Sequence, residues 1–234
     1  MRRHNAHVES VSLVARQLAN LNRDIAFTGG AIVGLLLTDS AAPDVRPTDD
    51  VDVIVDVSRY ADYASLQDEL RKAGFIHDMD GPNCRFILNA LKVDIMPSDG
   101  KVLGFADRWY DLAVSSANDH LLPDGTIIRL ISATAFVATK LEAFRDRGNG
   151  DFVLSHDMED VIAVVNGRSE LLEEVRTTSK DVRQYICETF SQLVNDPEFL
   201  DAVGTHLLPD KASQERAKLI SQRMIAISEL AAAP

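Results

Sequence analysis

Apolar and polar residues follow two different patterns along this chain of 234 residues, and the change of pattern divides it into two halves. Up to about residue 131, short runs rich in β-branched residues are separated by segments whose apolar positions recur at helical spacing. From residue 132 onward, the helical spacing continues without such runs. We therefore expect an α/β (α+β) domain over residues 1–131 and a helical domain over residues 132–234.

The individual elements follow from these runs and from the glycines, prolines and asparagines between them. Strands are predicted over residues 25–27, 51–57, 75–77, 85–88 and 91–96, with a further hairpin over residues 121–131. The hairpin of residues 85–96 is expected to turn at Asn89-Ala90. Helices are predicted over residues 7–20, 31–37, 61–73, 133–147, 157–166, 170–176, 181–194, 198–207 and 212–230.

Two aspartates lie on one face of the second predicted strand. Residues two apart on a strand point to the same side, so Asp50 and Asp52 present two carboxylates to one place. Val51, Val53 and Val55 point to the other side, toward a core. Two carboxylates this close repel each other unless a proton or a cation lies between them. A divalent ion with oxygen ligands, Mg²⁺ or Mn²⁺, fits this arrangement, with the phosphates of a nucleotide completing its shell.

A double glycine precedes the aspartate pair. Gly29 and Gly30 lie where the first predicted strand turns into a helix. Glycines at such a turn let the backbone approach a ligand closely, and the amide groups of a helix start favour negative charge. A tight turn without a ligand uses the same residues, so the double glycine points to a phosphate site only in combination with the aspartates.

A third carboxylate, Asp94, lies in the apolar segment Leu-Lys-Val-Asp-Ile-Met of residues 91–96. An acidic residue among apolar neighbours is costly unless it is paired or binds a metal. If its strand is a neighbour of the strand that carries Asp50 and Asp52, three carboxylates converge. Such a site could hold two metal ions about 3.5–4 Å apart, one at the attacking oxygen and one at the triphosphate. The sequence therefore predicts an enzyme that transfers phosphoryl or nucleotidyl groups.

Taken together, these motifs resemble those of the nucleotidyltransferase superfamily of the DNA polymerase β type. The segment from Arg46 to Asp52 is similar to the Arg-x-Thr-x-Asp-x-Asp motif of AbiEii/AbiGii-type nucleotidyltransferases, which are toxins of type IV toxin–antitoxin systems. Residues 134–147 resemble the lysine helix of that family, and residues 155–161 resemble its closing motif. The resemblance covers residues 27–161. It implies a mixed sheet flanked by helices, followed by a helical half that completes the active-site cleft.

The resemblance also implies roles for particular residues. The residues expected in the reaction or at the metal are Asp50, Asp52, Asp94, Lys140 and Asp157. Those expected at the nucleotide are Gly29, Gly30, Thr48, Lys140 and Arg147. Asp94 would be the third metal ligand or the base that takes the proton of the acceptor hydroxyl, and Lys140 would steady the triphosphate. Asp157 and Asp160 lie three apart on one helix face, and one of them would orient Lys140, help to activate the acceptor or contact the nucleotide. The alternative is that both are acids at a helix start, where they favour the helix dipole.

Charge leaves the acceptor of the transferred group open. The 36 acidic residues outnumber the 24 basic ones, so the formal net charge is −12, which disfavours loose binding to a polyanion. The resemblance implies a toxin that acts on tRNA or another cellular polymer and is neutralised by an antitoxin protein. The charge instead favours a small acceptor such as an antibiotic. Arg129, Lys140, Arg145 and Arg147 are one candidate for a local basic patch that would suit RNA, and Arg2-Arg3 is another.

Other features are typical of a cytoplasmic protein without membrane contact. Cys84 and Cys187 lie in no metal-binding spacing and are expected to be reduced thiols. No stretch approaches the ~18 uninterrupted apolar residues of a membrane span, and the N-terminus lacks the apolar core of a signal peptide. We expect an enzyme that uses a nucleoside triphosphate as co-substrate. The alternative is a non-catalytic nucleotide-binding module, which would have no reason to keep costly converging charges.

Overall fold

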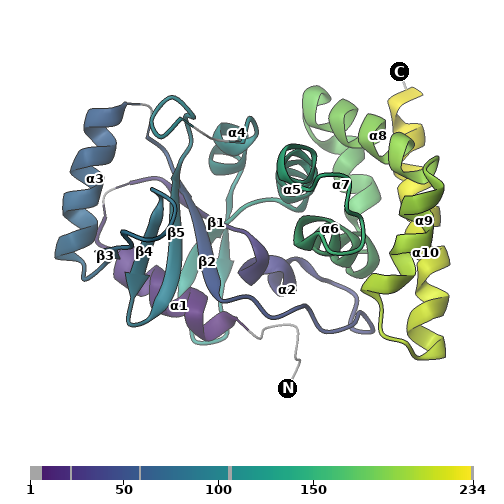
Figure 1. Cartoon of the computed structure of the whole chain (residues 1–234), viewed down its shortest axis with the longest axis horizontal. Helices are drawn as coiled ribbons and strands as arrows, with labels where there is room; N and C mark the ends of the chain where they lie inside the picture. Colours follow the sequence, from purple (N-terminus) through teal and green to yellow (C-terminus); the bar gives the residue numbers. More distant parts are fainter. Residues whose placement is uncertain (1–6, 22, 58, 105–106, 233–234) are drawn as a thin grey trace. The chain divides into compact units, whose positions relative to one another are not determined.

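The chain forms two compact units, as the computed structural model shows for residues 7–21, 23–57, 59–104 and 107–232 (Figure 1). The first unit contains Met1–Gly34 and Arg46–Ser132, and the second contains Leu35–Val45 and Ala133–Pro234. Among the described residues, none of the helices combines the length and the apolar character that crossing a membrane requires.

The first unit is built on one mixed sheet with helices beside it. Its strands are β1 (Ile25–Thr28), β2 (Asp50–Val55), β3 (Ile76–His77), β4 (Arg85–Leu88), β5 (Leu91–Pro97), β6 (Asn118–Leu121) and β7 (Ile127–Leu130). Its helices are α1 (Val8–Leu18), the 3₁₀ turn η2 (Gly30–Ile32), α3 (Tyr60–Lys72) and α4 (Tyr110–Ser115), and the unit boundary falls within α2 (Val33–Leu36). Over the described residues the strand order is β3-β4-β5-β2-β1-β7-β6. β2 runs parallel to β5 and β1 parallel to β7, and the other neighbours are antiparallel.

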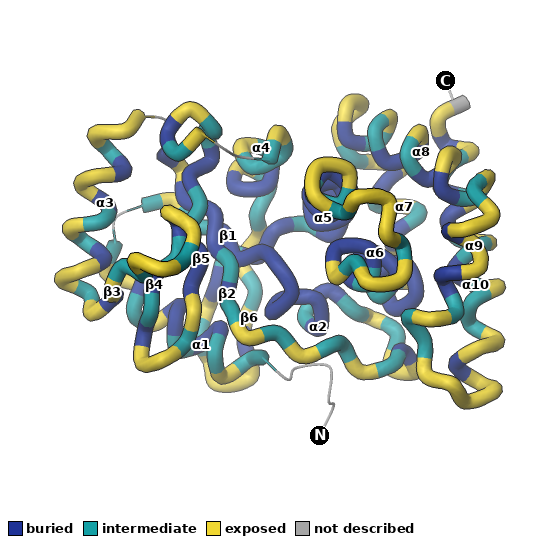
Figure 2. The backbone as a smooth tube through the Cα atoms, viewed as in Figure 1, coloured by how far each residue is buried: buried dark blue, intermediate teal, exposed yellow. Residues whose placement is uncertain are grey.

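The centre of this sheet has the alternation that the sequence predicts. The valines of β2 are fully buried, whereas Asp50 and Asp52 are half-buried on its other face. Each buried valine contributes about 1.5–3 kcal/mol to folding. Helix α3 covers β5, because the hydroxyl of Tyr63 donates to the carbonyl of Ile95 at 3.1 Å, and its outward face is exposed (Figure 2). The core therefore fixes β2 and β5 and leaves Asp50 and Asp52 partly exposed on the other face of β2.

The hairpin of β4 and β5 turns at the predicted residues. Asn89 and Ala90 both have positive φ angles, 50° and 71°, as a two-residue type I′ turn requires. The turn sets Leu88 opposite Leu91 and, three pairs further, Arg85 opposite Asp94. Residues from the two strands thus meet at a place that the turn alone determines.

The second unit is a helical assembly. Its helices are α5 (Ala133–Arg147), α6 (His156–Gly167), α7 (Leu171–Thr177), α8 (Lys180–Val194), α9 (Pro197–Val203), the 3₁₀ turn η3 (Gly204–His206), α10 (Lys211–Ser228) and the 3₁₀ turn η4 (Glu229–Ala232). Residues 133–142 of α5 are all buried, which makes α5 a central helix. The segment Leu35–Val45 belongs here because the backbone N–H groups of Thr38 and Asp39 donate to the carbonyl of Gly167 at 2.9 and 2.8 Å.

The structure differs from the predicted elements at three short places. Helix α4 was not expected, because six residues are too few for helical spacing to be visible. The helix expected over residues 31–37 is the 3₁₀ turn η2 followed by a single α-helical turn. The helix expected over residues 198–207 ends at Val203 and continues as η3. The other predicted elements are present with shifts of a few residues at their ends.

The turn at Ala90 gives a test of the hairpin. Ala90→Gly should raise the free energy of unfolding by about 0.5–1 kcal/mol, because an alanine at positive φ is strained and a glycine is not. The same replacement at Ala64, an exposed residue within α3, should lower it by about 1 kcal/mol. Chemical denaturation measures both. Two changes of the same sign would show that Ala90 does not adopt this turn.

Candidate active site

Three carboxylates converge on one face of the sheet in the first unit. The parallel register of β2 and β5 sets Asp52 directly opposite Asp94, and Asp50 lies two residues earlier on β2. One oxygen of each carboxylate lies within 4.8 Å of the other two. Two ligands of one ion are separated by at most about twice the metal–oxygen distance, roughly 4–5 Å for Mg²⁺ or Ca²⁺. The three side chains, called the acidic triad below, therefore fit a divalent cation in donor type and spacing.

Two neighbours fix the carboxylates of β2. The hydroxyl of Thr48 donates to Asp50 Oδ1 at 2.6 Å. Asp52 lies against Gly29, so closely that a Cβ on Gly29 would be 1.8 Å from its Oδ2 atom. Gly29 also has φ 75° and ψ −170°, a region that is essentially restricted to glycine. From the sequence, a ligand was expected to approach the backbone at Gly29. In the structure, the side chain of Asp52 lies there instead.

Gly30 is less constrained than Gly29. A Cβ on Gly30 would lie 2.7 Å from Nη2 of Arg46, the end of a flexible side chain. The structure thus places Gly29, Gly30 and Thr48 beside the acidic triad. Their predicted contact with phosphate stays a prediction.

Arg85 is a residue of the site that the sequence interpretation missed. Its Nε and Nη2 atoms donate to the two oxygens of Asp94, each at 2.7 Å, and Nη2 lies 3.7 Å from Asp50 Oδ2. The hydrogen bonds to Asp94 raise the pKa of Arg85 above its ordinary value. The signal was present in the sequence, because a two-residue turn at Asn89-Ala90 sets Arg85 opposite Asp94.

The thiol of the neighbouring Cys84 is protonated at neutral pH. Burial, together with the charges of Asp94 and Asp52, raises the pKa of its thiol to about 12. Cys84 and Cys187 are both buried and form no disulfide.

The other predicted site residues form a separate cluster in the helical unit. The ammonium of Lys140 lies 3.0 Å from Asp157 Oδ1 and 2.8 Å from Asp160 Oδ2. Arg147 donates to both oxygens of Asp157, at 2.8 and 2.9 Å. Lys140 is only 9% exposed, so it is not a solvated surface lysine. The structure shows the predicted contact between Asp157 and Lys140 and adds Arg147 to it.

The charge state of Asp157 follows from these partners. Burial by itself would raise its pKa, but the hydrogen bonds and charges of Arg147 and Lys140 outweigh burial, so the pKa lies below its ordinary value. The carboxylate is therefore ionised at neutral pH. It stabilises the folded state through two cations that come from α5.

The cations of the first candidate basic patch are each bound to carboxylates, and the other candidate, Arg2-Arg3, lies outside the described residues. Lys140 and Arg147 bind Asp157, as described above. Arg129 donates to Asp24 at 3.1 Å, and Arg145 pairs with Glu142. These cations thus have acidic partners within their own units, which weakens the case for a polyanion site at them.

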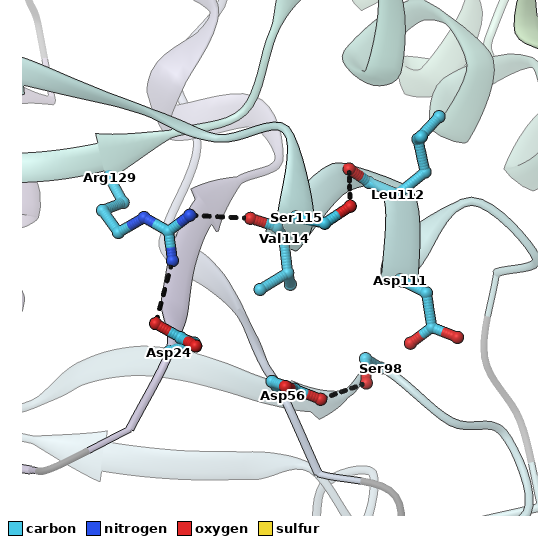
Figure 3. Close-up of a pocket in the computed structure, with 8 residues that line it drawn as sticks. All are labelled: Asp24, Asp56, Ser98, Asp111, Leu112, Val114, Ser115 and Arg129. Atoms are coloured by element: carbon cyan, nitrogen blue, oxygen red, sulfur yellow. Dashed lines mark hydrogen bonds and ion pairs between the residues drawn. The ribbon is translucent and has the colours of Figure 1, made fainter. Parts of the chain in front are cut away.

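A separate cavity lies in the first unit at the far end of β2 (Figure 3). Its volume is about 760 Å³. The residues that line it are Asp24, Asp56, Ser98, Asp111, Leu112, Val114, Ser115 and Arg129. Asp56 follows the last residue of β2, whereas Asp50 is the first, so this cavity does not contain the acidic triad. Its polar groups bind one another, since Arg129 connects Asp24 with the carbonyl of Val114.

The contact between Gly29 and Asp52 gives a matched pair of variants. Gly29→Ala should lower the free energy of unfolding by about 2–3 kcal/mol, because it strains the backbone and displaces Asp52. Gly30→Ala should cost less than about 1 kcal/mol, since only the end of the Arg46 side chain must move. Thermal denaturation of both variants measures the difference. Equal losses would contradict the close contact with Asp52.

The buried pair of Asp157 gives a pH-dependent test. Asp157→Asn should cost about 3 kcal/mol at neutral pH, the lower end for breaking a buried pair, because Lys140 keeps Asp160. The folded-state pKa is lowered, so this stabilisation is present above the unfolded pKa of about 3.9 and is lost as pH falls through the folded value. Denaturation at several pH values should show wild type and variant converging below about pH 4.

The control is Glu173→Gln, which removes an exposed ion pair with Arg176. It should change stability by less than about 0.5 kcal/mol at any pH. A constant difference between wild type and Asp157→Asn down to pH 3 would contradict the lowered pKa.

Known proteins resemble this chain in structure rather than in sequence. No model of a protein family matches the sequence, and no curated protein sequence is significantly similar to it. An antigenic nucleotidyltransferase-like protein from Paracoccidioides brasiliensis has a similar structure, with a TM-score of 0.51 and 19% identity over 84% of this chain and 92% of that chain. A candidate nucleotidyltransferase from H. pylori reaches a TM-score of 0.48 and 11% identity over 99% and 97% of the two chains, which is too weak for any inference. The first likeness shows the fold, and the predicted fold class, a nucleotidyltransferase-type mixed sheet with helices followed by a helical half, is confirmed.

Proposed function

We propose that the protein is a metal-dependent nucleotidyltransferase of the DNA polymerase β superfamily. The observation that carries this proposal is the acidic triad, which joins three carboxylates from two parallel strands within 4.8 Å. The fold supports the proposal, because a protein of similar structure is described as nucleotidyltransferase-like. Structural likeness at 19% identity speaks for the fold alone, so the chemistry rests on the triad.

The proposed reaction transfers a nucleoside monophosphate from a nucleoside triphosphate. An acceptor hydroxyl attacks the α-phosphorus and gives up its proton to water, the bond from that phosphorus to the β-phosphate oxygen breaks, and pyrophosphate leaves. Asp50, Asp52 and Asp94 would hold Mg²⁺ or Mn²⁺, which when bound neutralises phosphate charge and activates the attacking oxygen. Thr48 and Gly29 would act by keeping Asp50 and Asp52 in place.

The contacts of Asp94 with Arg85 help to decide whether Asp94 is a metal ligand or a general base. Both of its oxygens accept hydrogen bonds from Arg85. To take the proton of the acceptor hydroxyl, Asp94 would have to give up at least one of them. A divalent ion attracts a carboxylate oxygen away from a guanidinium more strongly than a neutral hydroxyl does, and one oxygen of Asp94 lies within 4.8 Å of oxygens of Asp50 and Asp52. We therefore favour Asp94 as the third ligand.

Lys140 and Arg147 are proposed to contact the triphosphate, as the resemblance to AbiEii/AbiGii-type enzymes implies. In the structure both are bound to Asp157, so a phosphate oxygen would replace or share a carboxylate oxygen. Asp157 and Asp160 would then keep Lys140 oriented. This assignment depends on the motif resemblance alone.

The acceptor of the nucleotidyl group belongs to one of two classes, an RNA or a small hydroxyl compound. The motif resemblance favours a toxin that modifies tRNA and is neutralised by an antitoxin protein. The pairing of Arg129, Lys140, Arg145 and Arg147 with carboxylates and the net charge of −12 favour a small hydroxyl acceptor. Labelled nucleoside triphosphates incubated with the protein, total RNA and aminoglycosides would separate them, because the label appears either in the RNA or on the drug.

Asp50→Asn tests the catalytic assignment. The change removes a charge but keeps an oxygen for the Thr48 hydroxyl, so the melting temperature should stay within about 4 °C of wild type. Nucleotide transfer should fall at least about 100-fold, the scale for losing one group that stabilises transition-state charge. A quantitative transfer assay with Mg²⁺ measures this.

The matched control is Asp56→Asn, an exposed aspartate just beyond the other end of β2. It should leave transfer unchanged. A folded, fully active Asp50→Asn would refute the assignment. Failure of calorimetry to detect binding of ATP, GTP, CTP or UTP with Mg²⁺ would instead favour a non-catalytic module.

A further inference from the structure

The guanidinium of Arg85 lies where a cation bound to the acidic triad would need space. It donates to both oxygens of Asp94 at 2.7 Å and reaches within 3.7 Å of Asp50 Oδ2. Its side chain is 22% exposed and that of Asp94 is 13% exposed, so water screens this pair less than a surface pair. Arg85 therefore supplies positive charge between two of the three proposed metal ligands.

Bidentate pairing makes Arg85 a direct competitor of a metal. The planar fork of an arginine occupies both oxygens of one carboxylate in a fixed geometry. A divalent ion that binds Asp94 also brings two positive charges within a few ångströms of the guanidinium. The repulsion between them is strongest where the surroundings are partly buried. Metal and guanidinium thus favour the same oxygens and disfavour each other.

A purely structural role would leave a different signature. Arg85 and Asp94 are opposite each other on antiparallel strands, and oppositely charged cross-strand pairs stabilise hairpins. For such a structural role, Arg85 would need to contact Asp94 only. The same guanidinium also lies 3.7 Å from Asp50 on β2, a strand outside the hairpin, which favours a role at the triad in addition to the hairpin.

We propose that Arg85 is a positioning residue that holds Asp94 in the triad when no metal is bound and that a divalent ion binds only by displacing its guanidinium. This inference rests on the proposed function, since it concerns the same three carboxylates. In the metal-free protein Arg85 offsets the repulsion among them. When the bound ion offsets this repulsion in its place, the guanidinium releases at least one oxygen of Asp94.

Metal affinity measured without nucleotide tests this directly. Mn²⁺ binding to the full chain is followed by calorimetry and by the loss of the free Mn²⁺ signal in electron paramagnetic resonance. Arg85→Gln removes the competing charge and should bind Mn²⁺ about tenfold more tightly than wild type, as expected for removing one close like charge. Arg85→Lys keeps the charge without the fork and should lie between the two. Arg59→Gln, at an exposed arginine paired with Asp62, should match wild type.

Stability gives a second, independent readout. Without metal, Arg85→Gln should melt at a lower temperature than wild type, because the triad loses its guanidinium. Saturating Mn²⁺ should raise the melting temperature of the variant more than that of wild type. A structural hairpin pair would lower stability equally with and without metal.

The unaltered protein provides a measurement that does not depend on how the variants fold. The Nε–H signal of Arg85 in ¹H–¹⁵N spectra should shift on addition of Mg²⁺, as its hydrogen bond to Asp94 is exchanged. An unchanged signal at metal saturation would overturn the proposal.

The outcomes separate this inference from the proposed function. Equal or weaker Mn²⁺ binding by Arg85→Gln, with wild type binding normally, overturns the competition and leaves the metal site intact. Absence of Mn²⁺ binding by both proteins overturns the inference together with the metal site on which the proposed function rests. Tighter binding by Arg85→Gln, with the shifted Arg85 signal, supports it.

Discussion

Repulsion among three carboxylates, held together by the pairing of β2 with β5, is the constraint on which the candidate site depends. The backbone ladder sets Asp52 opposite Asp94, and Asp50 lies two residues earlier on the same face. Because main-chain hydrogen bonds fix this spacing, the repulsion must be offset locally by donors or positive charge. The contacts of the triad answer that need, since Thr48 donates to Asp50 and Arg85 donates to Asp94. The positions of Thr48 and Arg85 are thus explained by the negative charge of the three carboxylates.

The charged cluster of the helical unit is organised differently. Its two carboxylates, Asp157 and Asp160, face two cations, Lys140 and Arg147, so its charges are balanced within the unit. Such a cluster contributes to folding whether or not a nucleotide binds, provided that every member keeps a partner. Any contact of Lys140 with phosphate is therefore weakened by the cost of loosening its carboxylates. If Lys140 also bound phosphate, it would serve stability and binding at once, so a substitution of Lys140 would change both.

Much of the fold followed from local patterns, whereas the site depended on long-range pairing. The alternation of β2 and the turn at Asn89-Ala90 were visible in the sequence, and both are present. The parallel pairing of β2 with β5 joins segments about forty residues apart. The sequence therefore predicted convergence of the three carboxylates only on the condition that these two strands are neighbours. The close contact of Gly29 with Asp52 could not be predicted, because it depends on the ångström-scale approach of two strands. The pair of Arg85 and Asp94 was different, since counting from the turn would have revealed it.

Whether the acceptor is RNA or a small molecule depends on which lysine and arginine side chains can bind it. Binding to a nucleic acid draws its free energy mainly from counterions released when lysines and arginines meet phosphates. A cation that already pairs with a carboxylate must share or loosen that pair, which lowers its net contribution, most of all where the pair is buried, as at Lys140. Arg129, Lys140, Arg145 and Arg147 are all in this position, and the net charge of −12 adds long-range repulsion. An RNA acceptor would therefore have to be held by other groups, such as side chains that stack on bases, or by a basic partner protein. A small hydroxyl acceptor would need neither, because in the proposed reaction the triphosphate and its metal would provide the charge that positions the reacting atoms.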